Sequence, residues 1–205
     1  MTTKEKIMDV ALHMFSERGY EAVSIRDICG EVGIKESTLY YHFKNKKDIL
    51  DSLVAKFKAH IDGLLSHIDE IPAERAEEGR TDSDIQTQMM YSYMMDGYLF
   101  DPFCNLMLRL MMIEQFHNEE IRELYEKTLF SDPYEIQLRV FRTLAGAGYI
   151  PEDDIEAIVK EIHAHMTMLT FKYMLNGALT EERKEAYKKE VSEYMTGAIV
   201  RRLFS

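Results

Sequence analysis

The sequence predicts an all-α protein in which a small N-terminal head of three helices is joined by one long helix to a larger helical body. Three observations predict this fold class. Apolar residues recur at the i, i+3 and i+4 spacing of amphipathic helices along most of the 205 residues, capping residues mark helix starts, and strand patterns and repeats are absent. The spacing of these signals predicts about nine helices.

The composition narrows the class of protein. With 46% hydrophobic residues the chain can fill a substantial core. A membrane span needs a run of about 18 apolar residues, and neither such a run nor an N-terminal signal core is present. We therefore expect a cytoplasmic protein without a membrane partner. Cys29 and Cys104 lie in apolar helical surroundings, which indicates reduced core residues.

The head begins with two capped helices. Thr2 and Glu5 have the spacing of a capping box for a first helix that ends at Arg18-Gly19. Ser24 and Asp27 predict a second capping box, followed by a short helix that Gly33 breaks. A three-helix core of this size is marginally stable alone, so the head is expected to pack against the next helix.

The third helix of the head has one buried and one exposed side. Ile34, Leu39 and Phe43 are predicted to face inward. Two short helices across a glycine turn, the second with an outward polar and aromatic face, are typical of a helix-turn-helix that reads a major groove. The outward residues are Lys35, Glu36, Ser37, Thr38, Tyr40, Tyr41 and His42.

These outward residues suit different parts of a duplex. Glu36, Ser37, Thr38 and Tyr41 are assigned to base edges or the nearby sugar-phosphate. Tyr40, His42 and Lys46 carry donors suited to phosphate oxygens. The carboxylate of Glu36 repels phosphate unless it accepts a hydrogen bond from a cytosine amino group. The alternative is an ordinary solvent-exposed helix whose aromatic residues have no binding role. It does not explain why a Tyr-Tyr-His run is exposed between apolar residues that face inward.

The charge distribution agrees with a DNA-binding head on an acidic body. The net charge is −11, yet residues 1–60 hold ten Lys and Arg against nine Asp and Glu, so the negative charge belongs to the remainder. Lys44, Lys46 and Lys47 cluster where the reading helix ends. An acidic body limits non-specific binding and orients the head toward DNA.

A long helix is predicted from the cap at Asn45 to about Asp69, and it can belong to both head and body. We divide the chain into a helix-turn-helix domain at 1–48 and an effector-binding and dimerisation domain at 49–205. Residues 72–84 are predicted to form a loop, and the apolar segment 103–113 a buried helix at the body's centre. Helices are then predicted over 118–130, 134–145 with a break at Pro133, 155–176, and from the cap at Thr180.

The body contains a Met-rich centre with a few polar groups, which suits an irregular, largely apolar small molecule. Residue by residue, ordinary core filling explains these side chains at least as well. The candidate effector-pocket residues are Tyr91, Met94, Met95, Tyr98, Arg109, Met112, Phe116 and His117.

Other chemistry has little local support. His163 and His165 are two positions apart and diverge by about 200° on a helix, so they cannot share a metal ion on one face. No metal-ligand cluster, phosphate loop, dinucleotide fingerprint or hydrolase motif is present, so no metal, cofactor or enzymatic activity is predicted.

The last two helices have broad apolar stripes, which pack within one subunit or pair with a second copy of the chain. Two heads about 34 Å apart would occupy successive major grooves of a palindrome. A homodimer through the last two helices is therefore expected.

The run GIKESTLYYHFKNKKDIL resembles the signature of TetR-type transcriptional regulators, and IMDVALHMFSERGYEAVSIRDIC is similar to that family's first two helices. The resemblance covers about residues 4 to 55. It implies DNA contacts at Thr38, Tyr40, His42 and Lys46, with Arg26 as a contact from the preceding helix. It also implies a ligand cavity in the body.

The resulting hypothesis is a homodimeric, ligand-responsive repressor that a small molecule releases from a double-stranded operator. Two alternatives stay open at this point. One is a constitutive DNA-binding or interaction module with a solid body, and the other is a small-molecule-modifying helical enzyme with the same head.

Overall fold

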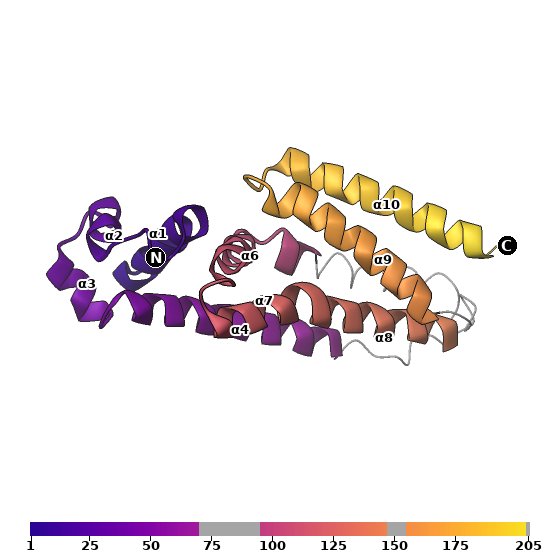
Figure 1. Ribbon diagram of the computed structural model, residues 1–205, viewed down its shortest axis with the longest axis horizontal. Coiled ribbons are helices and arrows are strands. Elements are labelled where there is room, and N and C mark those ends of the chain that lie inside the picture. Colours follow the sequence, from indigo (N-terminus) through magenta and orange to yellow (C-terminus); the bar gives the residue numbers. More distant parts are fainter. Residues whose placement is uncertain (70–94, 147–154, 204–205) are drawn as a thin grey trace. The chain divides into compact units, whose positions relative to one another are not determined.

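A computed structural model describes residues 1–69, 95–146 and 155–203, and these residues form nine α-helices with short π-helical segments and no strands. The predicted all-α class is confirmed (Figure 1). The chain forms two compact units. Unit 1 comprises Met1–Ser66 and Pro102–Tyr125, and unit 2 comprises His67–Asp101 and Glu126–Ser205. Within the described ranges, no helix is long and apolar enough to cross a membrane.

Unit 1 starts with the three helices of the head, α1 (Thr3–Arg18), α2 (Ile25–Val32) and α3 (Glu36–His42). Both predicted capping boxes are present at the starts of α1 and α2. Each box satisfies two backbone N–H groups that a helix start otherwise leaves unpaired. Apolar side chains from all three helices form a buried core, which includes Ile7, Leu12, Phe15, Ile28, Leu39 and Phe43.

The long helix α4 (Lys46–Asp69) has the bounds that the sequence predicts. Its first turn is capped, because the Asn45 side-chain oxygen accepts a hydrogen bond from the Asp48 N–H at 2.9 Å. The Asp48 carboxylate in turn accepts from the Lys44 N–H, also at 2.9 Å. The buried stripe of α4 includes Ile49, Leu50, Leu53, Phe57 and Leu64.

Helix α6 (Pro102–Glu114) is buried, as its apolar sequence predicts, but it packs against α1 in unit 1. The expectation that it lies at the centre of the C-terminal body is therefore wrong. Local hydrophobicity predicts burial but not the partner that provides it. The rings of Phe57 and Phe103 lie 6.5 Å apart between α4 and α6. The next helix, α7 (Glu119–Glu126), begins at the cap residue Asn118.

The predicted break before Pro133 is absent. The backbone of unit 2 stays helical from Glu126 through a π-helical segment, η3 (Lys127–Ser131), into α8 (Asp132–Gly146). The Asp132 N–H bonds the Lys127 carbonyl five residues earlier, as in a π-helix, and Pro133, in the first turn of α8, has no N–H to donate. The hydroxyl of Tyr98, on the π-helical segment η2 (Met95–Leu99), donates to the Thr128 carbonyl at 2.7 Å. This bond gives the Thr128 carbonyl a donor from outside the helix.

The last two helices pack against each other in unit 2. Helix α9 (Ile155–Leu169) continues as the π-helical segment η4 (Thr170–Leu175) and ends at Asn176-Gly177, as predicted. Thr180 caps α10 (Glu181–Leu203), because its hydroxyl accepts from the Arg183 N–H. Tyr187, fully buried, anchors α10 against the Phe100 ring at a centroid distance of 5.8 Å.

Candidate nucleic-acid interface

Helix α3 separates its apolar anchors from its aromatic surface. Leu39 and Phe43 are buried in the core of the head, whereas Tyr40 is 52% exposed and Tyr41 is 85% exposed. Leu39 and Phe43 therefore face inward and the tyrosine pair outward, as the sequence predicts, whereas Ile34, also expected inward, is half-buried. An exposed tyrosine pair held by buried neighbours presents hydroxyl donors on a fixed surface rather than on a flexible loop.

The other predicted reading residues surround this pair. The ring of His42 lies edge-on to that of Tyr41, with centroids 5.1 Å apart, which orients both rings. The half-buried residues of the predicted set are Thr38, His42 and Lys46, and the exposed ones are Arg26, Lys35, Glu36, Ser37, Tyr40 and Tyr41.

A glycine turn sets α3 relative to α2. Gly33 has φ +78° and ψ +37°, the left-handed conformation that glycine adopts without a Cβ penalty. The N–H groups of Gly33 and Ile34 both donate to the carbonyl of Cys29, at 3.0 Å each. The turn therefore ends α2 and starts α3 within a few residues, which is the helix-turn-helix connection.

Lys46 holds the turn between α1 and α2. Its ammonium group donates to the carbonyls of Tyr20 at 2.7 Å and Val23 at 2.9 Å, and it lies 4.1 Å from the centroid of the Tyr20 ring. Two of its three N–H donors are thus used inside the unit. The sequence suggested only a phosphate contact for Lys46, and its role in positioning the turn was missed because the partners lie far away in the chain.

A buried carboxylate fixes the same turn from α6. Glu114 is buried, and its Oε1 accepts a hydrogen bond from the Tyr20 N–H at 2.8 Å. Gly19 has φ +80° and ψ +156°, a region that is essentially restricted to glycine, and a Cβ there would meet Glu114 Oε1 at 3.3 Å. Glu114 therefore links α6 to the loop that leads into α2. Nothing in the local sequence indicated this contact.

The candidate effector residues do not form one group within a single unit. Tyr91 and Met94 lie outside the described residues. Met95 and Tyr98 are buried in unit 2. Arg109, Met112, Phe116 and His117 belong to unit 1, where Phe116 is 80% exposed just after α6.

The histidines of α9 have separate surroundings. The His163 ring contacts Tyr134 edge-on, and burial lowers the pKa of this imidazole. The His165 ring stacks on Tyr194 at a centroid distance of 3.7 Å. The two imidazoles have different partners, which agrees with the divergence expected from their spacing.

Comparison with known proteins gives the family. Residues 7–53 match the model of bacterial regulatory proteins of the tetR family. Over 68 residues, 33% of this chain, it is 43% identical to the biofilm operon icaADBC HTH-type negative transcriptional regulator IcaR of Staphylococcus epidermidis. Over 51 residues it is 47% identical to IcaR of Staphylococcus aureus. The matched stretches span 37% and 27% of those regulators, so they cover the head and little of the body.

Solved structures extend the likeness of fold to the body. A transcriptional regulator from Saccharomonospora viridis, solved in complex with choline, has a TM-score of 0.64 at 21% identity, covering 94% of this chain and 95% of that one. A TetR-family regulator from Mesorhizobium loti has a TM-score of 0.58 at 16% identity, with 95% of each chain covered. The family match at residues 7–53, together with the helix-turn-helix of α2 and α3, identifies the head of this chain as that of the tetR family of bacterial regulatory proteins, and the solved structures show that the whole chain shares its fold with known regulators.

Proposed function

We propose that this protein is a homodimeric transcriptional repressor that binds a palindromic DNA operator and is released by a small molecule. The observation that carries the proposal is the surface of α3, where Tyr40 and Tyr41 are exposed between the buried anchors Leu39 and Phe43. The IcaR relatives, which are negative transcriptional regulators, support repression. Binding to DNA puts its site of action in the cytoplasm.

The proposed contacts follow the chemistry of the exposed groups. Tyr40, His42 and Lys46 bind phosphates, and Tyr41 reaches base edges or sugar. Lys46 keeps one N–H donor beyond the two that Tyr20 and Val23 use, so a phosphate contact is compatible with its structural role. The remaining proposed contacts are Arg26, Lys35, Glu36, Ser37 and Thr38.

Dimerisation through the last two helices is supported by apolar side chains on the outside of unit 2. Met168 on α9 and Phe171 on η4 are exposed and three positions apart along a continuous helix. Residues three or four apart lie on neighbouring positions of a helix surface. Pairing with a second copy would cover both side chains and place two heads on one palindrome.

An effector response is supported by the fold shared with the regulator from Saccharomonospora viridis, which was solved with choline. The proposed effector of this chain is largely apolar, and residues 49–205 bind it while residues 1–48 read DNA. The effector favours a placement of the two heads that does not fit both grooves. The effector must bind this state more tightly than the DNA-binding state, and the difference in binding free energy must be about 1–3 kcal/mol.

The DNA-binding part is tested by selecting operators from a random double-stranded library with the full chain. Affinity for the selected duplex is then measured for the wild type and for Tyr40→Ala and Tyr41→Ala. Tyr40→Ala should weaken binding to all sequences alike by about tenfold, the value of one lost phosphate hydrogen bond, because phosphates carry no sequence. Tyr41→Ala should also relax the selected sequence.

Phe116→Ala is the matched control, because it removes an exposed aromatic ring from the same unit outside α3. Its operator affinity should equal that of the wild type. Unchanged affinity in both tyrosine variants would refute the proposed interface.

The effector part is tested by measuring operator affinity with and without each member of a panel of small apolar compounds and choline. A compound that raises the thermal unfolding midpoint should lower operator affinity at least fivefold, which corresponds to about 1 kcal/mol of coupling. Compounds that bind without changing the affinity would contradict the release mechanism and favour a constitutive DNA-binding module. The relatives are regulators, so no catalytic step is proposed.

A further inference from the structure

Two charged side chains bond the backbone of the same residue in the turn that leads into α2. Glu114 on α6 accepts a hydrogen bond from the Tyr20 N–H at 2.8 Å, and Lys46 on α4 donates to the Tyr20 carbonyl at 2.7 Å. Lys46 also donates to the Val23 carbonyl at 2.9 Å. Both backbone groups of Tyr20 are therefore bonded by side chains of helices other than α1, α2 and α3.

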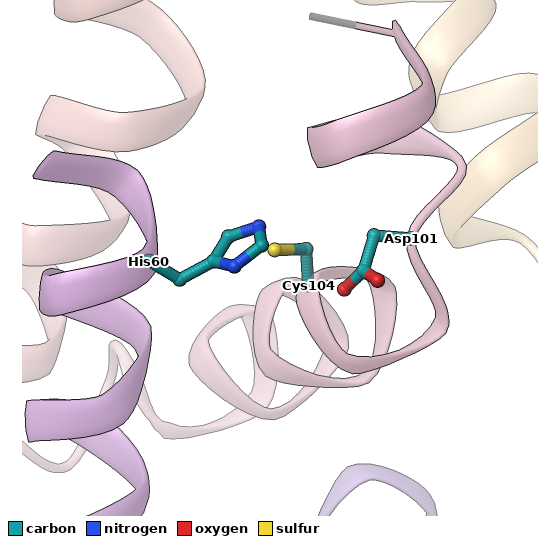
Figure 2. Close-up of side chains that lie close together, drawn as sticks. All are labelled: His60, Asp101 and Cys104. Atoms are coloured by element: carbon teal, nitrogen blue, oxygen red, sulfur yellow. The ribbon is translucent and has the colours of Figure 1, made fainter. Parts of the chain in front are cut away.

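The two helices that supply these side chains also contact each other within unit 1. Figure 2 shows the His60 imidazole of α4 directed at the Cys104 thiol of α6, and an imidazole nitrogen and the sulfur lie within 4.8 Å of each other. The Lys56 ammonium group of α4 lies 4.4 Å from the centroid of the Phe103 ring of α6. Helices α4 and α6 thus form one packed frame, and both bond the same residue of the turn.

The carboxylate of Glu114 is in an unusual place for a packing residue. Glu114 is only 5% exposed, on a mostly apolar helix that packs against α1. Removing a carboxylate from water costs free energy, and a hydrophobic side chain of similar size often packs at least as well. The bond to the Tyr20 N–H is therefore better explained by a need to fix the position of the turn than by added stability.

The residue before Tyr20 leaves room for this carboxylate. A Cβ at Gly19 would meet Glu114 Oε1 at 3.3 Å and Ile113 Cγ2 at 3.4 Å. A larger residue at this position would push against the end of α6. The glycine therefore lets the carboxylate of Glu114 reach the backbone of the turn.

We propose that Glu114 is a positioning residue for DNA reading, through which α6 sets the place of α2 and α3. The turn leads directly into Ser24, the cap of α2, and Gly33 joins α2 to α3. Contacts to phosphates and base edges require the reading helix to keep a fixed register on the duplex. The inference rests on the proposed function, and Glu114 acts through the turn without contacting DNA itself.

The test compares two replacements of Glu114 in the full chain. Glu114→Gln keeps an oxygen that can accept from the Tyr20 N–H, whereas Glu114→Leu fills a similar volume without an acceptor. Both variants lose one negative charge, which on electrostatic grounds alone strengthens DNA binding. Affinity is measured for the selected duplex and for a duplex of unrelated sequence, at a temperature where thermal unfolding shows each variant to be folded.

Glu114→Leu should weaken binding to the selected duplex by about tenfold or more and binding to the unrelated duplex by less, so the ratio of the two affinities should fall. Non-specific binding depends mainly on charge and less on the exact place of α3. Glu114→Gln should bind the selected duplex within about twofold of the wild type. Wild-type affinity in Glu114→Leu, or an equal loss in both variants, would overturn the positioning role.

Met107→Ala is the matched control for a loss of packing, because Met107 is fully buried on the same helix. The truncation leaves a cavity and should lower the thermal unfolding midpoint without removing the bond to Tyr20. Its affinity for the selected duplex should stay within about twofold of the wild type. A loss as large as that of Glu114→Leu would assign the effect to packing and overturn the role. Glu114→Met, which also lacks an acceptor oxygen, answers the same question if the leucine variant does not fold.

Amide hydrogen exchange at Tyr20 measures the hydrogen bond itself, without DNA. The Tyr20 N–H should exchange slowly in the wild type and in Glu114→Gln, and about tenfold faster or more in Glu114→Leu. Fast exchange in the wild type would overturn the proposal. A wild type that binds no duplex would overturn the proposed function, whereas a wild type and a Glu114→Leu variant that bind the selected duplex equally well would overturn the positioning role alone.

Discussion

Replacing Lys46 with methionine separates its structural role from its role in DNA binding. The variant keeps the apolar stem and removes an ammonium group that bonds the carbonyls of Tyr20 and Val23 and lies over the Tyr20 ring. Hydrogen bonds from charged donors contribute about 1.5–3 kcal/mol each when buried, and a cation–π contact about 0.5–1. Because the site is only partly buried, we expect a loss of about 2–4 kcal/mol in the free energy of unfolding.

The adjacent Lys47→Met is the control, because the ion pair that Lys47 forms with Asp51 is exposed to solvent. Urea denaturation should show a clearly lower midpoint for Lys46→Met and a nearly unchanged one for Lys47→Met. Both variants lose one positive charge beside α3, so a larger loss of operator affinity in Lys46→Met under folding conditions would report a phosphate contact. Equal unfolding free energies in the two variants would refute the structural argument.

Three further predictions follow from local geometry. Gly19→Ala should cost about 1–3 kcal/mol of unfolding free energy, because the backbone there is restricted to glycine, whereas Gly63→Ala on α4, with open space around its Cβ, should gain up to about 1 kcal/mol. Urea unfolding of both variants checks this. The lowered pKa of His163 means that the unfolded chain binds a proton more readily. Stability should therefore fall as the pH drops below about 6.5, more steeply in the wild type than in His163→Gln when thermal midpoints are compared. Met168→Glu should weaken self-association at least tenfold in sedimentation velocity, since it would put a carboxylate into the proposed dimer contact. An unchanged dimer would remove Met168 from that contact.

Local signals predicted most of the elements and the two sides of the reading helix. The capping boxes at Thr2 and Ser24 form because each depends on residues three positions apart. Leu39 lies inside and Tyr41 outside because helical periodicity assigns them to opposite sides. Interactions between residues three or four positions apart can be predicted from short stretches of sequence.

Contacts between distant segments were not predictable in the same way. The helix continues across Pro133, and the nearby Thr128 carbonyl accepts a hydrogen bond from the Tyr98 hydroxyl, a residue that no window around Pro133 contains. The Glu114 bond to Tyr20 depends on α6 packing against α1. The hydrophobic sequence of α6 predicted that this helix is buried. Many helices could pack against the same apolar surface, so the sequence of α6 alone does not predict that its partner is α1.

Both cysteines of the chain are buried, which makes the protein a convenient background for site-specific spectroscopy. A single new cysteine in place of Ser37, which is exposed on α3, would be the thiol that a maleimide dye or nitroxide reaches first. In a two-fold assembly the two labels would report the distance between reading helices directly. Adding a candidate inducer to such a labelled sample would then show whether the distance between the two reading helices changes.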